Sequence, residues 1–234
     1  LVLKTRLYGG DNVFSACLSV WGDSIAKGVV FDEARGRYAV CRDSCLQLIK
    51  REGGVAVENH AVMGQTSQDG LARMQPEALK PGEITVIEYG GNDCDLDWRA
   101  VAEHPDVLQY GKVPVEQFSR NLEEMVDRVR AADAEPVLVT PPPLVAYRYF
   151  DWVSRGLNAD NILKYLGDVE AIFRWQENYA NHVAALAERL SVKLVDIRSR
   201  MLAGDTEELV CVDGIHPNER GHRVIYEAVV PLLQ

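Results

Sequence analysis

The chain has 234 residues, of which 47% are hydrophobic and 26% charged, and its formal net charge is −10. This length suits one sizeable α/β domain with a buried core, and we treat residues 1–234 as a single domain. A strongly negative surface repels phosphate backbones and anionic headgroups, so neither nucleic acid nor a membrane surface is an expected partner. No apolar run approaches the roughly 20 residues that span a bilayer.

The cysteines and the first residues bear on the cellular compartment. The five cysteines are an odd number, and their spacing matches no disulfide framework or zinc site, so we expect mostly buried free thiols. The initial LVLKTRLYGG lacks the apolar core of a signal peptide. A cytoplasmic location is therefore expected, while the absence of an initiator methionine leaves open a trimmed upstream segment.

Apolar runs and helical spacings alternate along the first part of the chain. Val13–Trp21 is predicted to be a buried strand, and Tyr38–Arg51 has the spacing of a helix. Val55–Val62 predicts a second strand, and Thr66–Leu79 a second helix. Ile84–Tyr89 is short and β-branched, which favours a third strand.

The same alternation continues to the C-terminus. Glu116–Ala132 places its apolar residues on one stripe of a helix. Pro136–Thr140 predicts a strand that cannot extend into the three prolines that follow it, because proline lacks the donor that a sheet needs. Val169–Leu190 predicts a long amphipathic helix, Val192–Ile197 a last strand, and Asn218–Leu232 a last helix.

Strands that alternate with helices predict an α/β fold, with a mainly parallel sheet and helices on both faces in three α/β/α layers. Two stretches, about 94–114 and 141–168, interrupt the alternation, and each follows a predicted strand. Loops at the carboxyl ends of parallel strands build the binding sites of such sheets. We therefore expect both long loops to form part of a site.

Three short motifs fall at this same edge of the predicted sheet. Ser24, in Gly22-Asp23-Ser24, follows the first strand and begins a helical turn whose N–H groups suit an oxyanion, although alone it would be an ordinary turn serine. Asn92, in Gly90-Gly91-Asn92-Asp93, offers a neutral donor for developing negative charge. Asp213 precedes His216 by three residues, and such a carboxylate fixes the tautomer of an imidazole base.

With Gly64 in Val62-Met63-Gly64-Gln65, these motifs stand in a recognisable order. The chain resembles the GDSL-type esterases and lipases, also called SGNH hydrolases, whose four blocks carry a serine, a glycine, an asparagine and a histidine. Ser24, Gly64, Asn92 and His216 match those four residues. The first block reads Gly-Asp-Ser-Ile where the family has leucine, which exchanges one aliphatic residue for another.

The resemblance implies the SGNH hydrolase fold, with a flavodoxin-like, five-stranded sheet, and a serine-dependent ester hydrolase. It implies that Ser24, Asp213 and His216 are catalytic, with Ser24 attacking and His216 as the base. The N–H groups of Ser24 and Gly64 and the side chain of Asn92 would form the oxyanion hole. No metal and no organic cofactor is implied. We interpret Asp23 and Asp93 as structural residues that hold their loops.

Aromatic residues in the two long loops are candidates for binding substrate: Trp98, Tyr147, Tyr149 and Trp152. The expected partner is a small-molecule ester, for example an acetylated carbohydrate. Three alternatives remain open. The same acyl-enzyme could serve an acyltransferase, the activity could be of the lysophospholipase or thioesterase type, or the chain could be a non-catalytic α/β binding module.

Overall fold

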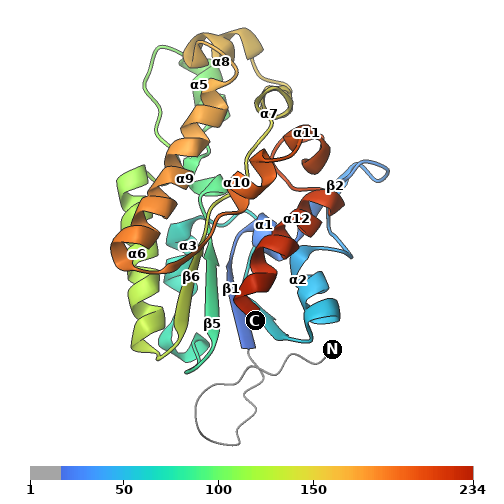
Figure 1. Ribbon diagram of the computed structural model, residues 1–234. Helices are drawn as coiled ribbons and strands as arrows, with labels where there is room; N and C mark the ends of the chain where they lie inside the picture. Colours follow the sequence, from blue (N-terminus) through green and yellow to red (C-terminus); the bar gives the residue numbers. More distant parts are fainter. Residues whose placement is uncertain (1–16, 234) are drawn as a thin grey trace, which may run out of the picture.

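The computed structural model describes residues 17–233, and its centre is a five-stranded parallel sheet (Figure 1). The strands stand in the order β4-β1-β5-β6-β7. Their bounds are β1 (Cys17–Gly22), β4 (Ala56–Asn59), β5 (Ile84–Glu88), β6 (Glu135–Val139) and β7 (Lys193–Val195). Counted within this sheet the order is 2-1-3-4-5, which confirms the flavodoxin-like α/β fold expected above.

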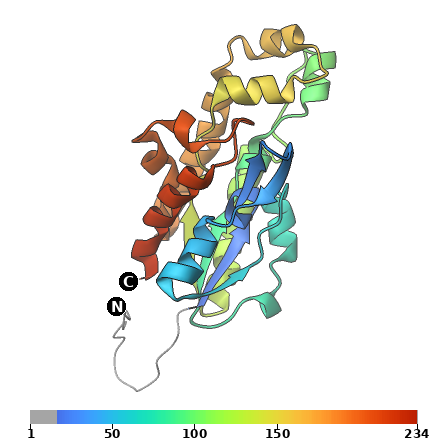
Figure 2. The same cartoon turned by 90° about the vertical axis from the view of Figure 1, so that its right-hand side faces the viewer.

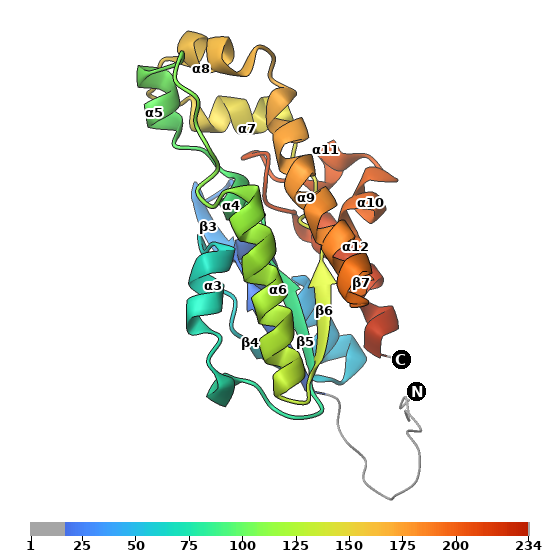
Figure 3. The same cartoon turned by 90° about the vertical axis from the view of Figure 1, so that its left-hand side faces the viewer.

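Helices cover both faces of this sheet. Figure 3 shows the face that is covered by α3 (Ser67–Arg73), α6 (Val115–Ala131) and α9 (Ala171–Leu190). The opposite face, turned toward the viewer in Figure 2, carries α2 (Cys45–Leu48), the π-helical turn η1 (Ile49–Gly53), α10 (Ile197–Leu202) and α12 (Glu219–Val229). Among the helices of residues 17–233, none has the length and apolar character to cross a membrane.

Successive residues of the central strands pack into two separate hydrophobic cores, one on each face of the sheet. On β5, Val86 packs with the α2 and α12 side, whereas Ile87 packs with the α6 and α9 side. Val137 and Leu138 divide in the same way on β6. Because side chains alternate across a strand, a strand buried on both faces consists of nearly continuous apolar residues, as these two do.

The predicted helix at Tyr38–Arg51 is wrong in its first part. Residues 37–40 form β3 (Arg37–Val40), which pairs antiparallel with β2 (Val29–Asp32) in a hairpin. Its turn ends at Gly36, whose positive φ of 61° suits glycine. Helical structure starts only at Cys45. The predicted strand Val13–Trp21 begins outside the described residues, and β7 is shorter than Val192–Ile197.

The stretches expected to be long loops contain three helices, which we call the cap: α5 (Trp98–Glu103), α7 (Ala146–Val153) and α8 (Ala159–Leu166). The cap lies beyond the carboxyl ends of the strands, at the top of Figure 1. Val101 and Ala102 of α5 pack on Ile162 of α8 in a small core of their own. These two stretches are therefore insertions at the edge of the site, and buried contacts between α5 and α8 hold them together.

The remaining short elements connect these layers. They are α1 (Ser24–Lys27), α4 (Gly91–Cys94), α11 (Thr206–Leu209) and the 3₁₀ turns η2 (Pro76–Ala78) and η3 (Val230–Leu233). All five cysteines lie in the described part of the chain, and each is a free thiol.

Candidate active site

Four of the residues expected at the site meet in one cavity of about 450 Å³. Ser24 begins α1 directly after β1, and Asn92 lies in α4 after β5. Gly64 follows β4, and His216 precedes α12. The sheet order reverses between β1 and β5, and the crevice at such a reversal is where open parallel sheets bind their ligands.

Asp213, His216 and Ser24 form a hydrogen-bonded chain. His216 Nδ1 lies 2.6 Å from Asp213 Oδ2, and His216 Nε2 lies 2.9 Å from Ser24 Oγ. When Nδ1 donates its proton to the carboxylate, Nε2 of the neutral ring is left as the acceptor for the serine hydroxyl. Ser24 and His216 are separated by 192 residues, so only the folded sheet brings them together.

Asp213 is fully buried, yet it remains an anion. Burial by itself raises the pKa of Asp213, but the hydrogen bonds from the His216 ring and from the backbone N–H groups of Ile215 and His216 outweigh it and lower the pKa below its usual value. A carboxylate held ionised beside the imidazole stabilises the imidazolium form.

The loop that carries Asp213 and His216 is fixed by contacts with α7. Val145 donates from its N–H to the carbonyl of Gly214 (2.8 Å). Gly214 has φ of +81°, and a Cβ placed there would lie 2.8 Å from the Val145 carbonyl oxygen. Only glycine fits this crossing of two backbones.

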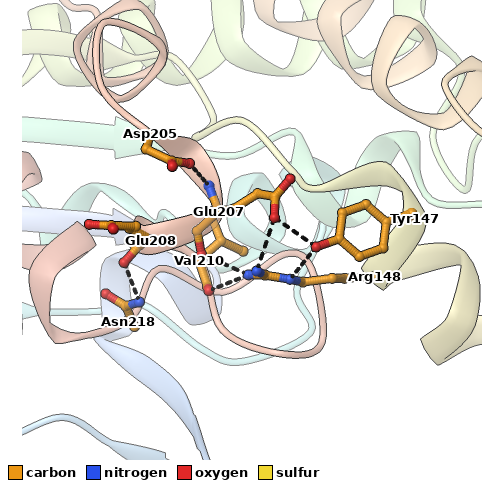
Figure 4. Close-up of polar contacts among 7 residues, drawn as sticks. All are labelled: Tyr147, Arg148, Asp205, Glu207, Glu208, Val210 and Asn218. Atoms are coloured by element: carbon orange, nitrogen blue, oxygen red, sulfur yellow. Dashed lines mark hydrogen bonds and ion pairs between the residues drawn. The ribbon is translucent and has the colours of Figure 1, made fainter.

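Arg148 of α7 also holds this loop, through hydrogen bonds to the residues that precede it (Figure 4). Its Nη1 donates to the carbonyls of Glu207 (2.8 Å) and Val210 (3.1 Å). Tyr147 donates from its hydroxyl to Glu207 Oε2 (2.8 Å). The two bonds from Arg148 satisfy carbonyls around the end of α11, which leads into the 210–217 loop.

Ser24, Gly64 and Asn92, which are expected to form an oxyanion hole, all line the cavity. Within residues 17–233, the backbone N–H groups of Ser24 and Gly64 donate to no protein acceptor. Asn92 Nδ2 donates one of its two N–H bonds to Asp23 Oδ2 (2.8 Å), which leaves the second one available. Gly64 has φ of +81° with open space beside it, so a substrate can approach its N–H closely.

A pair of buried carboxyl groups supports this donor set. Asp23 also accepts from the N–H of Ile25 (2.8 Å), and it is 1% exposed. Glu88, at the end of β5, is 3% exposed, and neither of its carboxyl oxygens has a hydrogen-bond partner among the described residues. Burial and the charge of Asp23 raise the pKa of Glu88 well above its ordinary value, and burial also raises the pKa of Asp23. The pair therefore holds a proton more strongly than solvated carboxyl groups do.

Asp93 has a separate structural task. It accepts hydrogen bonds from the hydroxyl and the N–H of Ser67 at the start of α3, and Asn121 of α6 donates to the same hydroxyl. Burial raises the pKa of Asp93 to about 7, although the bonds from Ser67 oppose the rise. Both Asp23 and Asp93 thus hold loops, as expected, but Asp93 does so across 26 residues and not in a local turn.

Tyr38, a residue of β3 at the site, was not among the residues predicted from the sequence. Its ring lies 5.0 Å from the His216 ring, between centroids, and it lines the cavity. Burial and the nearby Asp213 carboxylate raise the pKa of the phenol above its usual value. The available signal for this hairpin was the β-branched and aromatic residues of Val29–Asp32 and Arg37–Val40, which flank a short turn that ends at Gly36.

The four aromatic candidates for substrate binding divide into two pairs. Trp98 and Tyr149 line the cavity. Tyr147 does not; it is 45% exposed and bonded to Glu207. Trp152 does not either, because it packs edge-on against Phe31 of the hairpin, with ring centroids 4.8 Å apart. On α7, Tyr147 and Tyr149 are two residues apart, so their side chains leave the helix on opposite sides.

Metal-ligating side chains are not gathered at this site. Within residues 17–233 no group of three or more histidine, cysteine, aspartate or glutamate side chains is placed to hold a metal ion. His222, the nearest other histidine in sequence, is fully buried, and burial lowers its pKa to about 4. It is thus a neutral packing residue.

Two curated relatives of the chain are named as esterases. The chain is 29% identical over 154 residues to a GDSL esterase/lipase of Arabidopsis thaliana, which covers 64% of this chain and 58% of that protein. It is 24% identical over 169 residues to the isoamyl acetate-hydrolyzing esterase 1 homolog of Mus musculus, with 70% and 60% covered. The chain therefore spans less than two thirds of the length of these curated relatives.

A solved structure shares the fold over nearly the whole chain. The lipase/acylhydrolase from Enterococcus faecalis superposes with a TM-score of 0.65 at 21% identity, covering 93% of this chain and 94% of that one. The model of the GDSL-like lipase/acylhydrolase family matches residues 20–224, from β1 into α12. The chain therefore belongs to the GDSL-like lipase/acylhydrolase family.

Proposed function

We propose that the chain hydrolyses carboxylic esters through a covalent acyl-serine intermediate on Ser24. The observation that carries the proposal is the buried hydrogen-bonded chain from Asp213 through His216 to Ser24 Oγ, with distances of 2.6 and 2.9 Å. A nucleophile, a base and an orienting carboxylate in hydrogen-bond contact are the parts that acyl transfer to a serine requires.

In the first half of the reaction, Ser24 Oγ attacks the ester carbonyl carbon while His216 Nε2 takes the hydroxyl proton. The tetrahedral oxyanion is stabilised by the N–H groups of Ser24 and Gly64 and by the free N–H of Asn92. The C–O bond to the alcohol then breaks, and His216 returns the proton to the leaving alkoxide. His216 takes a proton from a water molecule, which attacks the acyl-serine. His216 then returns this proton to Ser24 Oγ as the bond between Oγ and the acyl carbon breaks and the acid leaves.

The proposed substrate is a small ester. An acetylated carbohydrate is one such class, and a relative named for hydrolysing isoamyl acetate points to another, a simple alkyl ester. In both cases the reacting bond is a carboxylic ester, so the same machinery serves either one.

Covalent labelling tests the central claim. A fluorophosphonate should add one phosphonyl group to the wild-type chain, and peptide mapping should place it on Ser24. Ser24→Ala should abolish labelling and reduce hydrolysis of a p-nitrophenyl ester by roughly 10⁴–10⁶-fold. Ser199→Ala, which removes an exposed serine of α10, is the matched control and should label normally.

Each other outcome has a definite meaning. Hydrolysis that survives Ser24→Ala at the wild-type rate would overturn the proposal. A folded wild-type chain without labelling or turnover would indicate a binding module. Transfer of the acyl group to an added alcohol faster than to water would make the same acyl-serine part of an acyltransferase.

A further inference from the structure

A buried arginine stands behind the part of the cavity wall that α9 forms. Arg198 is the second residue of α10, and its side chain is 6% exposed. Its Nη1 donates to Gln176 Oε1 (2.8 Å), whereas Nε and Nη2 are buried and have no hydrogen-bond partner among the described residues. Glu177 Oε1 lies 4.0 Å from Nη2, and Cζ lies 4.5 Å from the centroid of the Phe173 ring. The guanidinium is thus enclosed by protein with a single hydrogen bond, the one to Gln176.

Gln176 separates Arg198 from the cavity. It lies on α9, is 5% exposed and lines the cavity, whereas Arg198 does not. An arginine side chain can only donate, so the amide oxygen of Gln176 has to face it and the amide nitrogen has to point elsewhere. Within residues 17–233, Nε2 donates to no acceptor, yet protein atoms do not seal it off. The bond to Arg198 therefore fixes the amide so that its two N–H groups are offered to the cavity.

Three aromatic donors of the cavity wall, by contrast, are already used within the protein. Trp98 Nε1 and the Tyr149 hydroxyl both donate to Asp95 Oδ1, at 2.8 and 2.6 Å. Trp175 Nε1 donates to the carbonyl of Cys94 (2.7 Å). The wall also presents carbon surface from Leu96, Leu144, Leu166 and Ile172. A buried amide with unused N–H groups in such a wall requires an acceptor that enters the cavity, because unpaired buried donors cost free energy.

We infer that Gln176 Nε2 donates a hydrogen bond to a second oxygen of the substrate, separate from the ester group that reacts. This oxygen has to be an acceptor, as in a carbonyl or a carboxylate, because the amide nitrogen only donates. The charge of Arg198 polarises the amide and favours an oxygen that carries negative charge or a strong dipole. Gln176 is then a specificity residue and Arg198 the residue that positions it. The inference rests on the proposed function for the place of the reacting ester at Ser24.

Matched sets of ethyl esters test the inference by the ratio of kcat/KM for an oxygen-bearing ester to that for its plain parent. One set holds the esters of 4-oxopentanoic, 5-oxohexanoic and 6-oxoheptanoic acids, each beside the unsubstituted acid of the same length. A second set holds the monoethyl esters of succinic, glutaric and adipic acids, and a third carries the oxo group on the alcohol side, as acetates of keto alcohols. Titration of the released acid measures every rate. The ratio should be highest at one spacing, because Gln176 is fixed relative to Ser24.

Gln176→Glu is the decisive variant. It keeps an oxygen for the bond from Arg198 but replaces the donor nitrogen by a second acceptor, so the best ratio should fall by about tenfold or more. The larger fall, for the monoethyl esters or for the oxo esters, distinguishes a carboxylate from a neutral carbonyl as the preferred group. Gln47→Leu, on the exposed side of α2, is the control and should leave the ratio unchanged.

Two further changes keep the inference testable if a buried charge disturbs the fold. Gln176→Leu/Arg198→Met removes both polar groups together, so that neither is left buried alone, and should lower the best ratio by about fivefold or more. Arg198→Met by itself lets the amide present either of its atoms and should also lower the ratio, whereas Arg198→Lys retains a donor and should restore it in part. An unchanged ratio in Arg198→Met would show that Arg198 does not position Gln176.

A binding measurement distinguishes failure of this inference from failure of the proposed function. In ¹H–¹⁵N spectra of Ser24→Ala, the side-chain amide signals of Gln176 are identified by their loss in Ser24→Ala/Gln176→Glu. They should shift when an oxo ester is added and shift less with its plain parent. If no ester is hydrolysed but these signals respond in this way, the proposed function fails and the Gln176 site stands. If esters are hydrolysed and the ratio is the same in the wild type, Gln176→Glu and Gln176→Leu/Arg198→Met, the inference is wrong.

Discussion

The side-chain amide of Asn92 donates a hydrogen bond to Asp23 Oδ2 (2.8 Å), and so joins the carboxyl ends of β5 and β1. The same aspartate accepts from the N–H of Ile25 and caps α1, the helix that begins with Ser24. One carboxyl group therefore positions the proposed nucleophile and the proposed oxyanion donor with respect to each other.

The first prediction concerns this bond. Asn92→Ala should lower kcat by about 10²–10³-fold because it removes a donor to the oxyanion. Asp23→Ala should lower kcat by about tenfold or more, because the Asn92 amide is no longer held. The two effects should be less than multiplicative in the double variant, since Asp23 acts in part by holding the Asn92 side chain. Steady-state kinetics on one p-nitrophenyl ester measures all three, and a fully multiplicative double variant would show that Asp23 acts independently of Asn92.

The second prediction concerns Asp213. Asp213→Asn should keep the fold but lower kcat by roughly 10⁴-fold, because an amide does not fix the His216 tautomer or stabilise the imidazolium. Asp205→Asn, which changes an exposed aspartate that caps α11, is the control and should retain full activity. Circular dichroism shows whether both variants are folded. Near-normal turnover in Asp213→Asn would remove Asp213 from the mechanism.

The third prediction concerns the pH dependence of stability. Since the pKa of Glu88 is raised above its ordinary value of 4.5 in the folded chain, Glu88 favours folding at low pH, and this contribution is lost as the pH rises toward the folded pKa. Glu88→Gln carries no such charge at any pH. The free energy of unfolding of the wild type, relative to that of Glu88→Gln, should therefore fall as the pH rises from about 4.5.

Urea unfolding at several pH values between 4.5 and 9 measures this difference. Glu116→Gln, on the exposed side of α6, is the control and should follow the wild-type pH profile. Parallel curves for the wild type and Glu88→Gln would contradict the prediction, because they would mean that folding does not raise the pKa of Glu88.

The fourth prediction concerns Arg148 and the loop in Figure 4. Arg148→Met keeps much of the apolar stem but leaves the Glu207 and Val210 carbonyls without their donor, so it should lower the free energy of unfolding by about 1–3 kcal/mol. Arg174→Met removes an exposed ion pair with Asp168 and should cost less than about 1 kcal/mol. Urea unfolding of both variants is the measurement, and equal losses would show that Arg148 is no more than a surface pair.

The sequence was most informative where the pattern is local. Alternating strands and helices, with apolar runs such as Ile84–Tyr89, predict the parallel sheet, since a strand buried on both faces must be continuously apolar. The order of Ser24, Gly64, Asn92 and His216 predicts one site, because each follows a strand or precedes a helix at the same edge.

Other features could not be derived from such patterns. The strand β3 within Tyr38–Arg51 has an apolar spacing that also fits a helix, and only its pairing with β2 distinguishes the two. Trp152 and Tyr149 are three residues apart on α7, yet one packs on the hairpin and the other lines the cavity. Nothing in the sequence of β5 marks Glu88 as a buried carboxyl group. Its raised pKa comes from burial and from the Asp23 carboxyl beside it.

The sequence by itself thus determined the α/β class, the edge at which the site lies and the residue types of the proposed chemistry, because these depend on periodicity and on chain order. Only the tertiary structure decided which polar groups are free and which are already bonded. In the folded chain, one N–H of Asn92 is hydrogen-bonded to Asp23, and the indole N–H of Trp98 and the hydroxyl of Tyr149 are hydrogen-bonded to Asp95. Hydrogen bonds between residues far apart in the chain are fixed only when packing brings donor and acceptor within about 3 Å.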